Sequence, residues 1–176
     1  TLVTFADAWY VGQLGTAALA SLALVFPFQT LMQMMSGGAI GGGVTSSVAR
    51  ALGSGDESKA ASVLWHAIII AVAMSMVFVV ALGFFSRPVF ALLGGTGEAL
   101  NGAVAYARIT FGAGLAIWML YILSAALRGM GDTVTPARAI TVGSVVQVGL
   151  SGALTLGWGV FPDMGVVGPA MAMIVC

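Results

Sequence analysis

The chain has 176 residues, of which 60% are hydrophobic and only 7% are charged, with six basic and six acidic side chains. A water-soluble domain typically carries about 25% charged residues, so we expect lipid rather than water to cover most of this surface. The even charge balance argues against nucleic acid as a partner, because nucleic acid requires clustered Lys and Arg. The single cysteine, Cys176, allows neither an internal disulfide nor a cysteine-based metal site.

Long stretches without charge predict transmembrane helices, because a span needs about 20 mainly apolar residues. The predicted helices lie at about 1–11, 17–48, 60–84, 99–127, 136–157 and 165–176. Thr1 and Cys176 both lie inside apolar runs, so we expect the first and sixth helices to be truncated. The prediction is therefore a single unit over 1–176 that is a fragment of an all-α, polytopic membrane protein.

Polar, glycine-rich segments separate these helices and place alternate loops on opposite sides of the membrane. One side has the loops near 50–59 and 128–138, and the other has those near 12–16, 86–97 and 158–164. The first side holds four Lys or Arg residues and the second holds only Arg87. Positive residues favour the cytoplasmic side, so we expect the first pair of loops inside and the first helix to run outward.

Asp7 is the first candidate for a functional residue, because it interrupts an apolar helix between Phe5 and Trp9. A carboxylate inside a membrane is energetically costly and usually marks an ion or proton pathway that faces the protein interior. The alternative places Asp7 at the outer interface, because Gly12 ends the helix about one turn later.

Glycines form a second feature, at three- and four-residue spacing in the second predicted helix. They include Gly37, Gly38, Gly41 and Gly42. Such small faces allow helices to pack closely in lipid, and they also suit a bend or the wall of a cleft. The run is not a phosphate-binding loop, because no strand precedes it and no Gly-Lys-Ser/Thr follows it.

The sequence contains no residue pattern that indicates enzyme catalysis. Clusters of His and Cys are absent, and no Ser, His and Asp are spaced so that the predicted helices would bring them together. His66, which follows Lys59 closely, is expected to be an interfacial histidine, and Arg108 either extends to the headgroups or faces a cleft. We therefore expect a protein that is not an enzyme and needs no cofactor.

Several segments in order resemble the multidrug and toxic compound extrusion (MATE) transporters. They are Asp7–Ala20, Val48–Asp56, Leu127–Pro136 and Gly165–Ala170, together with Tyr106 and Arg108. The resemblance extends from late helix one to early helix six of that family. It implies one six-helix lobe of a twelve-helix, two-lobed bundle, whose C-terminal lobe is absent from this chain.

The resemblance also implies a function. MATE proteins export organic cations and drugs in exchange for protons or sodium ions, and Asp7 matches their cation-coupling aspartate in helix one. Where the family has asparagines and sometimes an aspartate in helix five, this sequence has Ser144, Gln147 and Ser151. The lack of that second carboxylate argues against a shared-proton or a sodium site between helices one and five, and we expect protons rather than sodium to bind at Asp7.

Rival interpretations stay open at this stage. A flippase for lipid-linked precursors has a related two-lobed fold, but it would need basic residues at the cleft, and only Arg108 qualifies. A membrane scaffold that transports nothing would not need Asp7. We expect an integral, multi-pass protein of a bacterial inner (plasma) membrane, with small organic cations or drugs and the lipid bilayer as its partners.

Overall fold

The computed structural model describes residues 2–157 and 164–176, and all regular secondary structure in this part of the chain is helical. The elements are α1 (Leu2–Gly12), α2 (Thr16–Gln33), the π-helix η1 (Met34–Ile40), α3 (Gly41–Gly53), α4 (Glu57–Phe78), the π-helix η2 (Val79–Phe84), α5 (Ser86–Leu92), α6 (Gly97–Gly112), α7 (Gly114–Gly129), α8 (Val134–Leu156), the 3₁₀ turn η3 (Gly165–Val167) and α9 (Gly168–Val175).

Three continuous helical stretches of the described chain are long and apolar enough to cross a membrane. They are Thr16–Gly53, Glu57–Phe84 and Val134–Leu156, with 38, 28 and 23 residues. The pair α6 and α7 passes the same test together, although its two helices meet at an angle of 47°. The predicted fold class, an all-α transmembrane bundle, is confirmed.

The structure differs from the sequence-based helices in three places. The helix expected at 17–48 continues to Gly53, where Arg50 lies in the last turn and suits the negative end of the helix dipole. The helix expected at 99–127 is divided at Ala113, which lies between two glycines of low helix propensity. The break expected at 86–97 contains α5, whose Pro88 is tolerated because it lies in the first turn.

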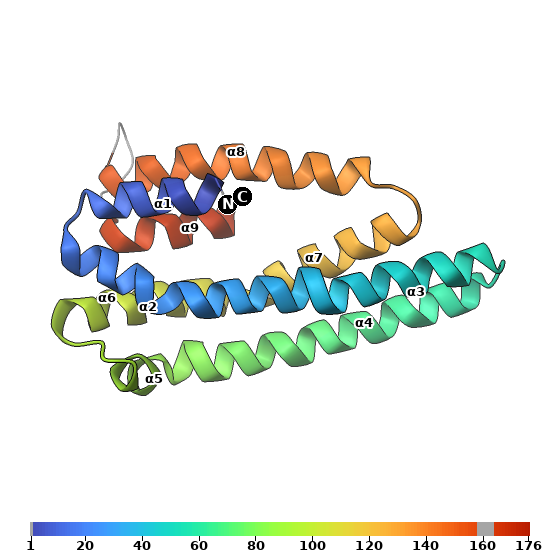
Figure 1. Cartoon of the computed structure of the whole chain (residues 1–176), viewed down its shortest axis with the longest axis horizontal. Helices are drawn as coiled ribbons and strands as arrows, with labels where there is room; N and C mark the ends of the chain where they lie inside the picture. Colours follow the sequence, from blue (N-terminus) through green and yellow to red (C-terminus); the bar gives the residue numbers. More distant parts are fainter. Residues whose placement is uncertain (1, 158–163) are drawn as a thin grey trace.

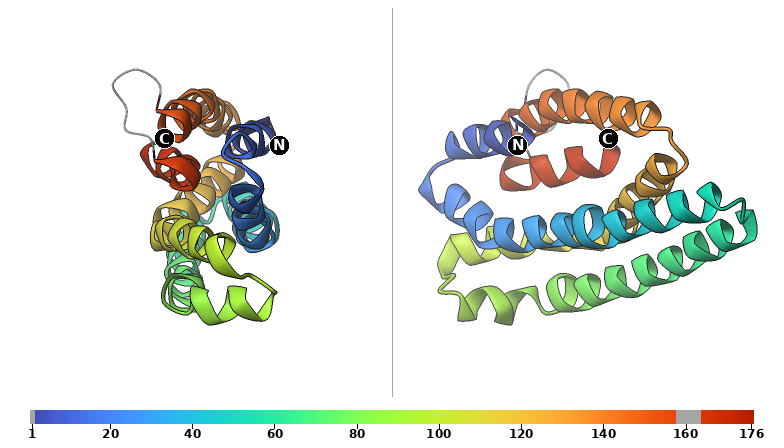
Figure 2. Two further views of the ribbon diagram at one scale, coloured as in Figure 1. Left: turned by 90° about the vertical axis from the view of Figure 1, so that its left-hand side faces the viewer. Right: turned by 45° about the vertical axis from the view of Figure 1, so that its right-hand side comes forward.

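The helices form two layers (Figures 1 and 2). One layer contains α1, α8 and α9, and the other contains α2, η1, α3, α4 and α5. Helices α6 and α7 run along the second layer, and α7 rises toward the start of α8. Both chain ends belong to the first layer.

The links between helices lie at the two ends of the bundle, as the sequence predicted. The links after α3 and α7 lie together at one end, and those after α1 and α5 lie at the other (Figure 1). The predicted loop near 158–164 falls, apart from Met164, outside the described residues. At the first end, Asp56 accepts a hydrogen bond from the Lys59 amide at 2.8 Å and so caps α4.

An aromatic core fills the second layer. The ring of Phe78 in α4 lies 6.1 Å from Phe111 and 6.4 Å from Trp118, measured between centroids. A second pair, Phe28 and Phe90, lies 6.0 Å apart. All five side chains come from different helical segments, so burying them holds α2, α4, α5, α6 and α7 together.

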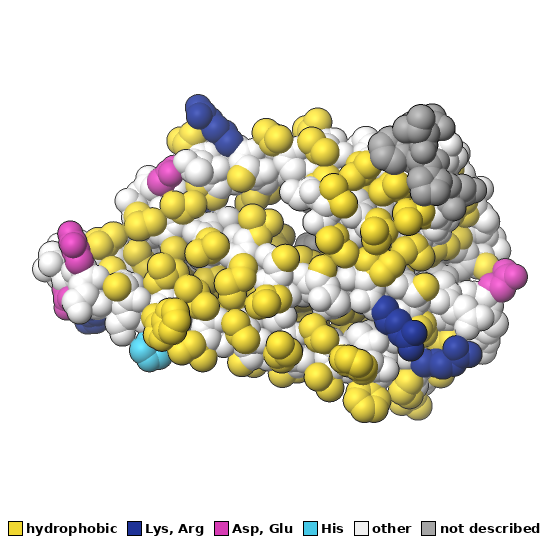
Figure 3. All heavy atoms as spheres, turned by 180° about the vertical axis from the view of Figure 1, so that it is seen from behind, with side chains coloured by type: hydrophobic (Ala, Val, Ile, Leu, Met, Phe, Trp, Pro, Cys, Tyr) yellow, Lys and Arg dark blue, Asp and Glu magenta, His cyan; other side chains and the backbone are white. Residues whose placement is uncertain are grey.

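The outer surface is largely hydrophobic, as lipid contact requires. Figure 3 shows yellow side chains over most of one face, with charged side chains gathered near its ends and edges. Large apolar side chains such as Phe84 and Leu92 are 74% and 88% exposed. A broad, continuous hydrophobic face is rare on soluble monomers, so this face is suited to a bilayer.

Candidate functional site

A cavity of about 380 Å³ lies between the two layers, and α1, α2, α6, α7, α8 and α9 all contribute to its wall. Its polar lining residues are Thr4, Asp7, Gln29, Thr30, Gln33, Tyr106, Tyr121, Ser144 and Gln147. Apolar side chains such as Phe26, Ile117 and Met173 complete the lining. A small number of polar groups in an apolar wall is the usual composition of a small-molecule site.

Asp7 lies in the interior, with only 7% of its surface exposed. Its Oδ1 atom accepts a hydrogen bond from the Ser151 hydroxyl at 2.5 Å, which joins α1 to α8. Asp7 therefore faces the interior of the protein and not the lipid. A carboxylate surrounded by low-dielectric protein interacts strongly with any cation that reaches it.

Gly152 on α8 lets this helix approach α1 closely beside Asp7. A Cβ atom on Gly152, the neighbour of Ser151, would lie 2.7 Å from Cζ of Tyr10. A side chain there would therefore displace the Tyr10 ring and separate α1 from α8. The close contact keeps Ser151 within hydrogen-bonding distance of Asp7.

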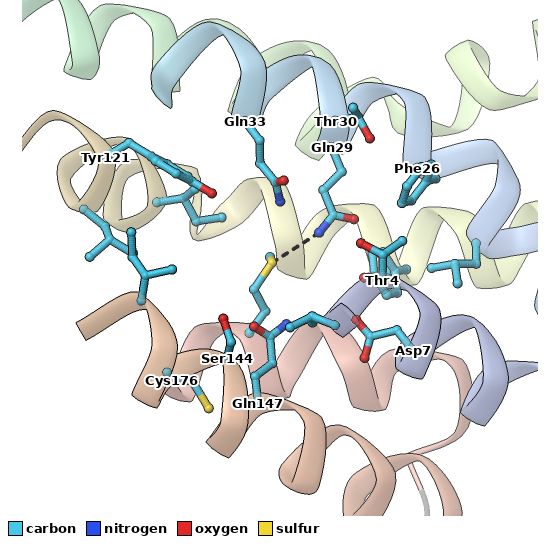
Figure 4. Close-up of a pocket in the computed structure, with 18 of the residues that line it drawn as sticks. Thr4, Asp7, Phe26, Gln29, Thr30, Gln33, Tyr121, Ser144, Gln147 and Cys176 are labelled. Carbon is cyan, nitrogen blue, oxygen red and sulfur yellow. Dashed lines mark hydrogen bonds between the residues drawn. The ribbon is translucent and has the colours of Figure 1, made fainter. Parts of the chain in front are cut away.

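The residues predicted on helix five all lie on α8 beside Asp7. Ser144 and Gln147 are half-buried and line the cavity, whereas Ser151 is fully buried behind it. Their spacing of three and four residues places them on one face of the helix. Figure 4 shows Ser144 and Gln147 of α8 and Asp7 of α1 across the cavity from α2.

The opposite wall contains residues that the sequence analysis did not select. Gln29, Thr30 and Gln33 of α2 line it (Figure 4), and the Gln29 amide donates to Sδ of Met173 at 3.3 Å. Buried Tyr106 on α6 interacts with both Gln29 and Asp7. Two amides four residues apart in a charge-free stretch were the sequence signal for this wall.

The cavity wall has one kind of charge. Asp7 is the one acidic side chain among the described lining residues, and none of those residues is Lys, Arg or His. Arg108 is exposed and does not line the cavity, and neither does His66. This wall therefore attracts cations and offers uncharged amide and hydroxyl groups for hydrogen bonds.

The four predicted glycines divide into two pairs, and none lines this cavity. A Cβ atom on Gly37 would lie 2.9 Å from the Tyr121 ring, and one on Gly41 would lie 2.8 Å from the Ser36 carbonyl oxygen. Gly38 and Gly42 have no such neighbour within 4 Å among the described atoms. Gly37 therefore allows Tyr121 to pack against η1, where it borders the cavity.

These features define a polytopic α-helical membrane protein with a polar cavity around a buried carboxylate. The MatE family matches residues 1–151, so the chain belongs to this family. A relative named FAD transporter, from Shewanella oneidensis, is 30% identical over 172 residues, which are 97% of this chain and 38% of the relative. The chain thus spans well under half the length of that relative.

Solved structures agree with this assignment. An inward-facing multidrug resistance MATE family transporter of the MOP superfamily is 29% identical, with a TM-score of 0.89 over 99% of this chain and 39% of its own. An outward-facing structure of such a transporter has a TM-score of 0.86 over 99% and 38%. The chain therefore corresponds to one lobe of a two-lobed, twelve-helix fold.

Proposed function

We propose that this chain is the N-terminal lobe of a secondary-active antiporter that exports organic cations or drugs in exchange for a coupling cation. The cation binds at Asp7, and a second six-helix lobe completes the cleft that holds the substrate. The protein works in the inner membrane of a bacterium. The observation that carries this proposal is a buried carboxylate beside a cavity without basic lining residues.

The likeness to two conformations supports an alternating-access mechanism. The chain has nearly the same TM-score with an inward-facing and an outward-facing relative. A lobe whose shape is kept in both states moves as a rigid body, and the site opens to one side and then the other as the lobes rock. The relatives' names also favour transport over catalysis or scaffolding.

We propose the proton as the coupling ion. Protonation neutralises Asp7 by itself, and the Ser151 hydroxyl can donate to the ionised carboxylate or accept from the protonated carboxyl group. Sodium requires several oxygen ligands, and the second carboxylate found in helix five of some MATE proteins is Ser151 here. Ser144, Gln147 and Thr4 then supply hydrogen bonds at the cavity wall.

The lining of the cavity favours a planar cationic substrate. Phe26, Tyr106 and Tyr121 offer aromatic rings, which attract organic cations, and Gln29 and Gln33 offer amides. FAD, the substrate in the name of one relative, is the second candidate. Its phosphates would have to find basic residues outside the described wall of this cavity.

The test uses the full-length protein in inside-out membrane vesicles. Ethidium uptake is followed while a proton gradient and a sodium gradient are applied separately, and FAD uptake is followed in the same way. Asp7→Asn is compared with Asp56→Asn, which removes an exposed carboxylate and still caps α4. We expect proton-driven uptake that falls to background in the Asp7 variant and persists in the Asp56 variant.

Each other outcome has a definite meaning. Proton-driven uptake that survives Asp7→Asn would contradict the role of Asp7. Uptake driven by sodium alone would correct the ion and keep the antiporter. Gradient-driven uptake of FAD itself, without uptake of ethidium, would transfer the assignment to the anionic substrate.

A further inference from the structure

A second cavity lies far along the chain from Asp7, between α3 and α4 near the link that joins them. Its volume is about 450 Å³, and its lining includes Gly43, Ser47, Lys59, Ser62, His66 and Ile70. We propose that this groove binds an anionic phospholipid from the leaflet at that end of the bundle, which the positive residues predict to be the cytoplasmic one.

The groove changes from polar to apolar along α4. Lys59, Ser62 and His66 are three and four residues apart, and Ile70 continues the same face one turn later. At about 1.5 Å per residue, Ile70 lies roughly 16 Å beyond Lys59 along the helix axis. This order matches a phospholipid, with its phosphate beside the ammonium group and its acyl chain along the apolar part.

The polar end offers hydrogen-bond donors as well as charge. Nδ1 of His66 lies 2.7 Å from the carbonyl oxygen of Ser62, and a carbonyl oxygen only accepts, so the proton is assigned to Nδ1. On that tautomer Nε2 accepts and does not donate, so the donors at this end of the groove are the Lys59 ammonium group and the Ser62 hydroxyl. Nη2 of Arg50 donates to Ser47 at 3.4 Å, which places a second positive charge at the rim.

Neither cation is neutralised by an ion pair. Among the described residues, no carboxylate lies within salt-bridge distance of Lys59 or Arg50. Asp56 and Glu57 belong to the same link, but the Asp56 carboxylate contacts the backbone amide of Lys59, and neither carboxylate forms an ion pair with the Lys59 ammonium group. The charge of this rim is therefore free to attract an anionic headgroup, and basic residues close to a membrane each favour anionic lipid.

The apolar end faces the bilayer. Figure 3 shows the chain's single histidine at the border of a broad hydrophobic face, close to the end that carries acidic side chains. Trp65, the neighbour of His66, is 63% exposed, and exposed Trp marks the level of the lipid headgroups. Gly43 keeps the groove open, since no described atom lies within 4 Å of its ideal Cβ position.

The test measures lipid binding to the purified full-length protein by native mass spectrometry. Phosphatidylglycerol is the probe, with zwitterionic phosphatidylcholine as the reference of no net charge and glycerol 1-phosphate as a free headgroup. Lys59→Gln removes the ammonium group, and Arg138→Gln removes an exposed charge that does not line the groove. We expect phosphatidylglycerol to bind about fivefold more weakly to Lys59→Gln and unchanged to Arg138→Gln.

A second pair of variants tests the shape of the groove without changing charge. Gly43→Leu fills the groove, whereas Gly42→Leu adds the same side chain to a neighbouring position that has open space and does not line it. We expect only Gly43→Leu to reduce binding of phosphatidylglycerol. Thermal unfolding of all four variants identifies any that fail to fold.

Three results would overturn the proposal. Equal binding of phosphatidylcholine and phosphatidylglycerol would remove the role of charge. Full competition by glycerol 1-phosphate would indicate a site for soluble anions. Unchanged binding in both Lys59→Gln and Gly43→Leu would show that another protein segment, or nothing, occupies the groove.

Discussion

Buried polar groups differ between two regions of this molecule, which are the contact of α1 with α8 beside the cavity and the aromatic core among α4, α6 and α7. Between α1 and α8, the carboxylate of Asp7 and the hydroxyl of Ser151 form a hydrogen bond beside the cavity. Between α4 and α7, the hydroxyl of Ser75 and the indole N–H of Trp118 have no partner among the described residues, and the same holds for the hydroxyl of Thr155 near the end of α8. The first set is paired and borders an open space, and the groups between α4 and α7 are enclosed by aromatic packing.

This difference separates a site from a scaffold. A carboxylate is retained in a membrane interior only where its charge is used, because the cost of placing it there is high. Scattered hydroxyls are tolerated in a well-packed core, where shape decides stability. We therefore expect the α4, α6 and α7 side to respond to changes in volume and the α1 and α8 side to respond to changes in hydrogen bonding.

The largest expected effect on stability is at Trp118, which is fully buried against Phe78. Trp118→Ala removes a large side chain from a packed core and should lower the free energy of unfolding by about 3–5 kcal/mol. Trp118→Phe keeps an aromatic ring and loses no described hydrogen bond, so it should cost clearly less. Denaturant unfolding in detergent micelles measures both, and equal losses would show that the indole N–H has an unseen role.

A matched pair of serines tests the comparison directly. Ser151→Ala leaves Oδ1 of the buried Asp7 without its donor and should cost about 1–3 kcal/mol. Ser75→Ala removes a hydroxyl that has no described partner, so we expect little change or a small gain. Equal losses of stability in the two variants, in the same unfolding measurement, would contradict the expected difference between the contact of α1 with α8 and the aromatic core.

The apolar stretches of the sequence predicted most of the fold, because the membrane imposes length and hydrophobicity on each span. The division at Ala113 and the helix α5 were missed, since breaks depend on how neighbouring helices pack rather than on hydropathy. The glycine run shows the same limit. Gly37 and Gly41 meet close neighbours, and Gly42, with a similar local sequence, does not.

The candidate site was predictable where a residue differs in polarity from the sequence around it. Asp7 stands out as an ionisable group in an apolar helix, and the resemblance to MATE proteins indicated the face of α8 opposite it. Gln33 and Tyr121 carry no charge, and they belong to the site because α2 and α7 border the same cavity. Tertiary packing decides that, and spacing along one helix does not reveal it.

A smaller effect is expected at the link between the spans, where Asp56 caps α4. Its Oδ1 accepts from the Lys59 amide at 2.8 Å, and loss of such a cap costs about 1 kcal/mol. Asp56→Ala should therefore lower stability by about this amount, whereas Asp56→Asn should retain most of it. Thermal unfolding of both variants checks this, and an equal loss in the two would assign the effect to charge rather than to capping.

The smallest effect is a pH dependence at Asp132, which caps α8 outside the membrane spans. Hydrogen bonds from Thr135 and Val134, with backbone donors at 2.9 and 3.1 Å, hold the pKa of this carboxyl below its ordinary 3.8. A pKa lowered by folding stabilises the folded state above the ordinary value, and this stability is lost as the pH falls through the lowered pKa.

Asp132→Asn isolates that charge, because asparagine also caps helices and does not titrate. We expect the wild-type protein to be more stable than the variant near pH 6, and this advantage to shrink steadily below about pH 4, close to the reference value for Asp. Melting temperatures of both proteins across pH 3–6 provide the measurement. A difference that stays constant with pH would mean that the cap of α8 depends on the shape of the side chain and not on its ionisation.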